Sequence, residues 1–144
     1  MWLFVGFSDE EIGSTSFEGE YLTLGIEGYI KGDIFALSSW RNIYNRYGEQ
    51  HFDAIMTDGG LHGIERVDGI VELKQKLLKD GGFIYNYFSV IGQRANDPLN
   101  RGYRFTFWKI PKDEYTIENH DKQYNNLATL SWSDAVKARL KLII

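Results

Sequence analysis

The stretch HFDAIMTDGGLHGIERVDGIVELKQKLLKDGGFIYNYF, His51–Phe88, decides the fold of this 144-residue chain. Its first part, Phe52–Thr57, is a short and mostly apolar run, which is typical of a buried strand. From Ile64 to Leu78 apolar residues recur at helical spacing, which predicts an amphipathic helix. The aromatic run Phe83–Phe88 then predicts a second strand. A strand, a helix and a strand of these lengths predict a right-handed βαβ unit in a parallel sheet.

Glycines mark both turns of this unit. Asp58-Gly59-Gly60 ends the first strand, and Asp80-Gly81-Gly82 is expected to end the helix, with Gly81 or Gly82 in the left-handed conformation. Open α/β sheets bind ligands at the carboxyl ends of their strands, so Asp58 is a candidate site residue. The alternative is that Asp58 is only a turn residue before two glycines. Charged residues fill the other positions of the helix: Glu65, Arg66, Glu72, Lys74 and Lys76.

Length and composition limit the classes of protein. A chain of 144 residues fits one domain with a real core, so we expect a single domain over residues 1–144. No apolar run approaches membrane-spanning length, which predicts no membrane partner. Because the chain lacks cysteine, disulfides and thiolate metal sites are excluded and a cytoplasmic or other intracellular location is favoured. The three histidines show no metal-binding spacing, and a net charge of −4 disfavours nucleic-acid binding through bulk charge.

The rest of the chain alternates strands with helices, which predicts an α/β fold: a Rossmann-like, mostly parallel sheet with helices on both faces and an antiparallel strand near the C-terminus. Ser8 is a candidate N-cap for a short first helix. The segment Ser89–Gly102 has the composition of a loop. The remaining expected elements are strands at Trp2–Val5, Tyr21–Ile26 and Tyr103–Ile110, a helix from Leu37 to Tyr47 ended by Gly48, a returning antiparallel strand at Glu114–Ile117 and a last helix at Asp134–Leu142.

Several short motifs occur in a fixed order. They are Gly6-Phe7-Ser8-Asp9, Tyr21–Gly28, Gly32-Asp33-Ile34 and the stretch FDAIMTDGG…LLKDGGFIYNYF. In this order and at this spacing they resemble the RNA 2′-O-methyltransferases of the FtsJ-like superfamily, most closely the cap-specific branch. The resemblance covers residues 2–88 well and the remainder loosely. It implies a Rossmann-like methyltransferase sheet, S-adenosyl-L-methionine as cofactor and RNA, with or without a cap, as substrate.

The resemblance also implies roles for individual residues. Glu27 would accept hydrogen bonds from both ribose hydroxyls of the cofactor, since a carboxylate is a charged acceptor with two oxygens. Asp33 would accept from the adenine amino group, and the Ile34 amide would lie near a ring nitrogen. Gly6 and Phe7 would belong to the cofactor loop. From the residues alone, Glu27 and Asp33 are equally well explained as solvated acids in turns.

The Lys-Asp-Lys-Glu set that the family uses to activate the 2′-hydroxyl is incomplete. Asp58 occupies the position of the catalytic aspartate, but the first lysine has no counterpart before the first strand. Asn86 occupies the position of the second lysine, and asparagine cannot act as a base near neutral pH. The alternative for Asn86 is a hydrogen-bonded polar residue of the strand. The glutamate is expected to be Glu114 or Glu118.

Three functions remain compatible with these motifs. The first is an S-adenosylmethionine-dependent RNA ribose methyltransferase with impaired catalysis. The second is an inactive methyltransferase-fold subunit with a structural, regulatory or RNA-binding role, working with a protein partner or the remainder of a larger protein. The third is a small-molecule O-methyltransferase. The basic, aromatic stretch Ser89–Lys112 fits either RNA contact or a hairpin core. We expect Glu27, Asp33 and Asp58 to face one cleft, because parallel strands end at one edge of a sheet.

Overall fold

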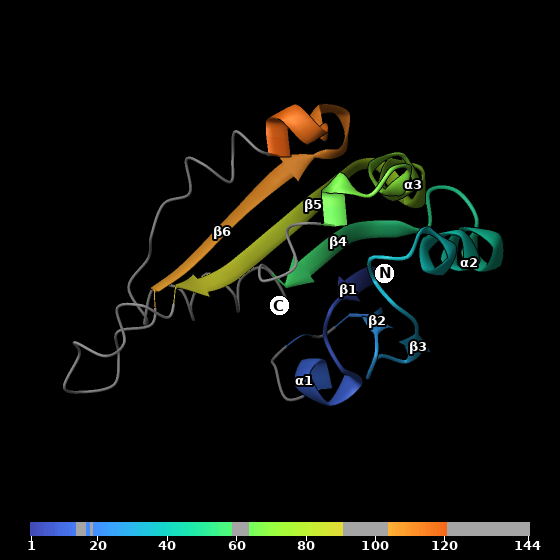
Figure 1. Cartoon of the computed structure of the whole chain (residues 1–144), viewed down its shortest axis with the longest axis vertical. Coiled ribbons are helices and arrows are strands. Elements are labelled where there is room, and N and C mark those ends of the chain that lie inside the picture. The colour runs from blue at the N-terminus through green and yellow to red at the C-terminus, as the bar shows by residue number, and fades with distance from the viewer. Residues whose placement is uncertain (14–16, 18, 59–63, 91–103, 121–144) are drawn as a thin grey trace.

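The computed structural model describes residues 1–13, 17, 19–58, 64–90 and 104–120, and for residues 58, 86–90 and 104–109 it describes the backbone alone (Figure 1). Strands in this part of the chain form one sheet, and helices pack on both of its faces. In chain order the elements are β1 (Trp2–Val5), α1 (Asp9–Gly13), β2 (Tyr21–Gly25), β3 (Ile30–Lys31), α2 (Leu37–Tyr47), β4 (Phe52–Asp58), α3 (Ile70–Leu77), β5 (Leu78–Val90), β6 (Arg104–Pro111) and the 3-10 helix η3 (Lys112–Glu114).

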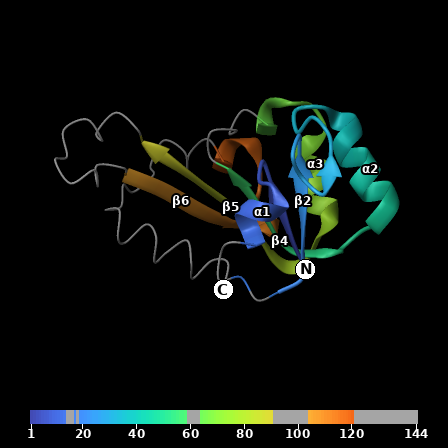
Figure 2. The same ribbon diagram turned by 90° about the horizontal axis from the view of Figure 1, so that it is seen from below.

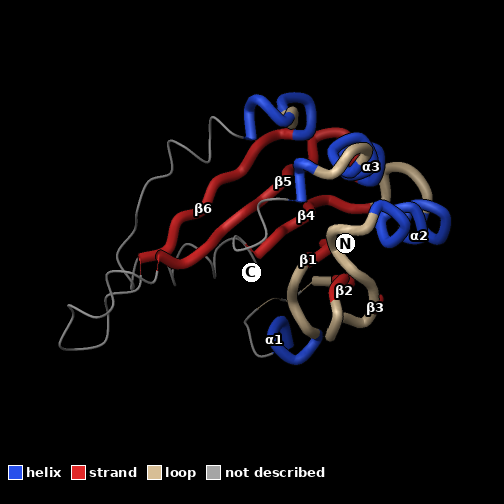
Figure 3. Tube along the Cα trace, viewed as in Figure 1, coloured by secondary structure: helices blue, strands red, loops and turns tan. Residues whose placement is uncertain are grey.

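The strands of the described residues follow the order β3-β2-β1-β4-β5-β6. All neighbouring strands are parallel except β5 and β6, which are antiparallel. β4 and β5 run in the same direction, with Ala54 beside Phe83 and Asp58 beside Tyr87. This arrangement confirms the predicted α/β class with a mostly parallel sheet and an antiparallel strand at its end, and it is compatible with a Rossmann-like fold. Beyond Tyr87, β5 pairs with β6, so these two strands continue past the end of β4 (Figure 3).

Helices cover both faces of the sheet, as predicted. On one face Ile12 of α1 packs with Phe4 and Met56 in a core cluster rich in aromatic residues. On the other face α2 and α3 lie side by side, as Figure 2 shows, and Trp40 and Ile70 belong to the larger core. The sheet is therefore the middle layer, and its carboxyl edge is open to the loops that follow β1, β2 and β3.

The prediction for α2 is confirmed over its whole length. The helix spans Leu37–Tyr47 and Gly48 follows it with φ 82°. Trp40 and Ile43 are buried, and the Trp40 Nε1–H donates to the Ile34 carbonyl oxygen over 2.9 Å. This bond ties the helix to the turn that leads into it from β3, where Asp33 and Ile34 lie.

The helix predicted from Ile64 to Leu78 is shorter than expected. Residues 64–66 form a 3-10 turn, and the α-helix begins only at Ile70. Gly69 explains the break, because its φ of 89° lies in the left-handed region, which cannot continue a right-handed helix. The amphipathic pattern continued through Gly69, so the periodicity alone did not reveal this boundary.

The predicted end of that helix is also wrong, since α3 ends at Leu77 and a strand begins at once. Leu78 already pairs with Phe52 and begins β5, whereas Ala54 pairs with Phe83, so residues 79–82 form a bulge in the strand. Gly81 does adopt a left-handed φ of 81°, but inside this bulge and not at a helix end. Asp80-Gly81-Gly82 is therefore part of a bulge near the amino end of β5, and not a turn that ends a helix.

A further correction concerns the segment after β6. The returning strand expected at Glu114–Ile117 does not form; η3 is followed by a helical turn at residues 117–120. Thr116 favours that turn, because its Oγ1 accepts from the Asn119 backbone N–H over 3.0 Å, as an N-cap does. The predicted loop Ser89–Gly102 lies mostly outside the described residues, and the predicted helix Asp134–Leu142 lies outside them entirely.

Candidate functional site

A cavity of about 280 Å³ opens at the carboxyl ends of β1 and β2 and beside the turn after β3. This is the edge at which open α/β sheets bind ligands. Two stretches of chain form its walls. The lining residues are Gly6, Phe7, Ser8, Glu11, Gly25, Ile26, Glu27, Gly32, Asp33, Ile34 and Phe35.

The first wall, Gly6–Glu11, leads from β1 into α1. The Gly6 N–H donates to the Leu24 carbonyl oxygen over 2.8 Å, which joins this wall to the neighbouring strand. Ser8 caps α1 as predicted: its Oγ accepts from the Glu11 N–H, and Glu11 Oε1 accepts from the Ser8 N–H, each over 3.1 Å. This reciprocal capping box satisfies two backbone donors at the helix start and fixes the direction of the wall.

The second wall, Gly25–Phe35, folds tightly on itself. The Gly25 carbonyl oxygen accepts from the N–H groups of Gly28 and Gly32, each over 3.2 Å. Asp33 Oδ1 accepts from the Phe35 N–H over 2.9 Å, which closes a small turn. Glu27 and Asp33 are both exposed in this wall, so their carboxylates are accessible to a ligand.

Apolar side chains complete the cavity. Phe7 and Ile34 are buried and hold the walls against the core. Ile26 and Phe35 are instead 85% and 43% exposed, which is unusual for side chains of this size. A site with exposed apolar groups and several carboxylates suits a flat, partly apolar ligand that presents hydrogen-bond donors or a positive charge.

The structure brings together most of the residues predicted from sequence for the cofactor. Gly6, Phe7, Glu27, Asp33 and Ile34 all line this one cavity. Ile26 and Phe35 cannot be predicted as site residues from the sequence, because an apolar residue in a loop gives no signal unless its exposure is known.

The predicted catalytic residues are distributed differently. Asp58 is the last residue of β4, and Asn86 of β5 pairs with Thr57 of β4. The side chains of Asp58 and Asn86 lie outside the described part of the structure. Glu114 follows β6, whose last residue, Pro111, pairs with Phe83. Phe83 lies beside Ala54 near the amino end of the parallel strands, so Glu114 is at the edge opposite Asp58. The structure therefore does not bring Glu114 together with Asp58.

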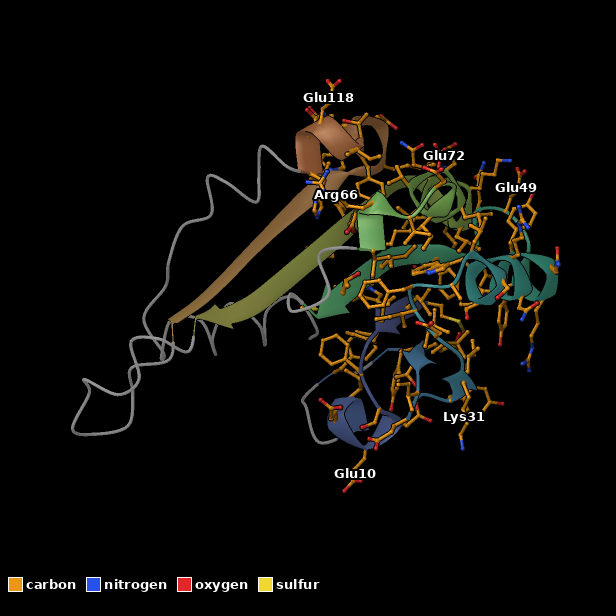
Figure 4. The ribbon with its side chains drawn as sticks, viewed as in Figure 1. Glu10, Lys31, Glu49, Arg66, Glu72 and Glu118 are labelled. Carbon is orange, nitrogen blue, oxygen red and sulfur yellow. The ribbon has the colours of Figure 1, made fainter. Side chains whose placement is uncertain are left out.

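The other glutamate considered, Glu118, does not replace Glu114. It lies in the turn at residues 117–120, beyond η3, and Figure 4 shows it pointing away from the sheet. Both glutamates are predicted from a loose likeness to a motif, and the direction of β6 carries both of them away from Asp58. Because β6 runs antiparallel, whatever follows it returns to the amino edge.

A second group of polar residues is buried away from the cavity. Glu65 Oε1 accepts from Lys74 Nζ over 2.8 Å and from the Tyr115 hydroxyl over 3.0 Å, and His120 Nε2 lies 3.4 Å from Glu65 Oε2. All four side chains are at most 3% exposed. Glu65 and Lys74 were expected at the charged positions of an amphipathic helix, and instead they form a buried ion pair.

The electrostatics of this buried cluster favour the charged form of Glu65. Burial alone raises the pKa of the Glu65 carboxyl, but the attraction of Lys74 and His120 and the Lys74 hydrogen bond outweigh it, so the pKa is lowered from 4.5. The pKa of Tyr115 is raised well above 10.0 by burial and by the neighbouring Glu65. The cluster joins residue 65, α3 and the segment after β6.

The described residues hold neither a metal-binding cluster of side chains nor a membrane-spanning helix. No group of three or more His, Cys, Asp or Glu side chains there is arranged to hold a metal ion. No helix in the described ranges has the length and apolar character needed to cross a membrane.

Comparison with known proteins adds no assignment. No protein-family model matches the chain, and no curated protein matches it significantly. The resemblance to FtsJ-like methyltransferases stays a prediction from the motifs.

Proposed function

We propose that the chain binds S-adenosyl-L-methionine in this cavity as an RNA ribose 2′-O-methyltransferase-like domain. The observation that carries the proposal is that Glu27 and Asp33, from two separate turns, line one cavity with Gly6 and Phe7 at the carboxyl edge of a mostly parallel sheet. Those are the positions at which the ordered motifs assign the cofactor contacts. A carboxylate at the end of the second strand suits a ribose, whose vicinal hydroxyls are two adjacent donors.

The chemistry of the lining favours an adenosyl group over a phosphorylated ligand. Glu11, Glu27 and Asp33 bring carboxylates to the walls, and the described lining residues include no lysine or arginine. Such a lining repels phosphate and attracts the positively charged methionine part of the cofactor. Ile26 and Phe35 offer exposed apolar surface for the adenine ring. When bound, S-adenosylmethionine supplies an activated methyl group.

RNA methylation is the finer part of the proposal. Asp58 ends β4 at the same edge of the sheet as the cavity, which is the edge where open α/β sheets bind ligands, and this supports a methyl acceptor on that side. The chain's basic and aromatic stretch around β6 supports RNA as that acceptor.

A second candidate is an adenosyl-binding domain that does not catalyse transfer. Two observations favour it: Asn86 stands where a lysine would be needed, and Glu114 lies at the opposite edge of the sheet from Asp58. Neither an asparagine nor a distant carboxylate can remove a proton from a ribose hydroxyl held near Asp58.

A pair of measurements separates these candidates. Binding of S-adenosylhomocysteine is measured by calorimetry, and methyl transfer to capped and uncapped RNA is measured with a radiolabelled methyl donor. Binding with transfer that disappears in Asp58→Ala supports the methyltransferase. Binding without transfer supports the non-catalytic domain, and no binding contradicts both.

A further inference from the structure

We infer that Asp9, Thr23 and Tyr29 form a hydrogen-bonded brace that positions Glu27 for its ligand, with Thr23 as the central positioning residue. This inference rests on the adenosyl-binding function proposed above. Asp9 and Tyr29 belong to the two wall stretches and Thr23 to β2, but none of the three is a lining residue of the cavity.

The Thr23 hydroxyl makes two hydrogen bonds at once. It donates to Asp9 Oδ1 over 2.6 Å and accepts from the Tyr29 backbone N–H over 2.7 Å. A hydroxyl can serve as donor and acceptor at the same time. The bond to the carboxylate is short and charge-assisted, and it polarises the hydroxyl so that the bond from Tyr29 is strengthened as well.

These bonds join the two walls of the cavity. Asp9 is the first residue of α1 and belongs to the Gly6–Glu11 wall. Tyr29 directly follows the turn from Gly25 to Gly28, which the Gly28 N–H closes, and Glu27 lies in the middle of that turn. The position of the Glu27 backbone relative to α1 is therefore set through the Thr23 side chain.

Packing leaves this turn little freedom to adopt another shape. A Cβ at Gly28 would lie 2.8 Å from the Gly25 nitrogen and 2.9 Å from the Thr23 carbonyl oxygen, so the turn is folded directly onto the end of β2. With the brace in place, the Glu27 carboxylate is presented from a fixed backbone. Prior fixing of a binding group reduces the entropy that the ligand must otherwise overcome.

Two observations indicate that the Thr23 hydroxyl has the specific role of linking the two walls. Thr57 is a second buried threonine, on β4, and among the described residues its Oγ1 has no hydrogen-bond partner. Capping of α1 is already provided by Ser8 and Glu11, so the bond to Asp9 is not needed to start the helix. What the Thr23 hydroxyl adds is the link between the walls.

The test uses the full chain with Thr23→Val, Thr23→Ser and the control Thr57→Val. Valine has the shape of threonine but lacks the hydroxyl, while serine keeps it. S-adenosylhomocysteine affinity is measured by calorimetry, and amide hydrogen exchange of Tyr29 by NMR. We expect Thr23→Val to weaken binding about tenfold and to speed Tyr29 exchange, since both hydrogen bonds are lost. Thr23→Ser and Thr57→Val should remain close to the unsubstituted chain in both measurements.

Asp9→Ala gives a second route if Thr23→Val fails to fold. Asp9 is exposed, so its removal leaves the core intact, and Glu10→Ala next to it is the matched control. Asp9→Ala should weaken binding and speed Tyr29 exchange, whereas Glu10→Ala should change neither.

The possible results distinguish failure of the brace from failure of the proposed adenosyl-binding function. If the unsubstituted chain binds and Thr23→Val or Asp9→Ala binds equally well, the brace is refuted and the proposed function stands. A fall in melting temperature with unchanged affinity would assign Thr23 a structural role only, and would also refute the brace. If the unsubstituted chain does not bind, the proposed function fails and this inference fails with it.

Discussion

Glu27 carries the most specific chemical expectation among the cavity residues. Its carboxylate is exposed in the turn after β2 and would accept from both ribose hydroxyls. We expect Glu27→Ala to weaken S-adenosylhomocysteine binding by about 1.5–3 kcal/mol, the scale of a hydrogen bond to a charged group. Isothermal titration calorimetry on both proteins measures this directly.

Glu10→Ala is the control for charge. Glu10 is an exposed acid of α1 that points outward, away from the rest of the molecule, in Figure 4. Removing it changes the net charge as much as removing Glu27 does, so equal weakening in both variants would mean that the effect is general electrostatic attraction and not a ribose contact.

Glu65 determines a pH dependence of stability. Its pKa is lowered below the ordinary value of 4.5 in the folded state, so its contribution is present above pH 4.5 and is lost as the pH falls through the folded value. At neutral pH, Glu65→Gln should lower the free energy of unfolding by about 3–5 kcal/mol, because Lys74 is left buried without its charge partner.

Urea unfolding at several pH values checks this expectation. The stability gap between the unsubstituted chain and Glu65→Gln should narrow below pH 4.5. Glu72→Gln, which alters an exposed acid of α3 labelled in Figure 4, should leave stability nearly unchanged. A gap that stays constant down to pH 3 would argue against an ionised Glu65.

Residue patterns predicted the cavity better than they predicted the buried cluster. Glu27 and Asp33 each follow a strand or strand edge, and strand ends meet at one edge of a parallel sheet, so their proximity could be expected. Helical periodicity predicts that Glu65 and Lys74 are exposed, because it assigns charged residues to the solvent face of a helix. Their burial depends on Tyr115 and His120, which come from a distant segment that the local pattern does not contain.

At the scale of elements, the turn after β2 is the most constrained part of the cavity. Gly28→Ala would place a Cβ against the Gly25 nitrogen and the Thr23 carbonyl oxygen, which are backbone atoms that cannot rotate away. We expect a loss of about 1–3 kcal/mol in stability, as for other overpacked sites, together with weaker ligand binding. Denaturant unfolding and calorimetry measure the two effects.

Gly13→Ala is the matched control for that substitution. Among the described residues, a Cβ there meets only the Tyr21 hydroxyl, at 3.9 Å, and Gly13 is the last residue of a helix. It should be neutral. If Gly28→Ala is equally neutral, then the turn is less tightly folded onto β2 than the structure indicates.

The elements differ in how far sequence could predict them. The bounds of α2 followed from apolar spacing and a terminal glycine, and both signals were local. The bounds of α3 did not follow, because Gly69 interrupts a pattern that otherwise continues, and because residues 79–82 bulge out of a strand. The position of Glu114 could not be predicted locally, because the antiparallel direction of β6 carries the chain back to the amino edge.

At the level of the whole molecule, we expect the chain to bind the cofactor but to catalyse methyl transfer poorly. Asn86 cannot serve as a base, and neither Glu114 nor Glu118 is placed beside Asp58. We therefore expect the chain to transfer little or no methyl group to capped or uncapped RNA even at saturating cofactor. Scintillation counting of methylated RNA is the measurement. Robust turnover that is lost in Asp58→Ala would contradict this expectation.

The central claim is that the cavity between the Gly6–Glu11 and Gly25–Phe35 walls binds an adenosyl ligand. Its most direct test is a calorimetric titration of residues 1–144 with S-adenosyl-L-methionine, run beside ATP, which shares the adenosine but carries phosphates. We expect saturable one-to-one binding of S-adenosylmethionine, weakened in Glu27→Ala, and much weaker binding of ATP because carboxylates line the site. Absence of binding to S-adenosylmethionine, or an affinity that Glu27→Ala leaves unchanged, would contradict it.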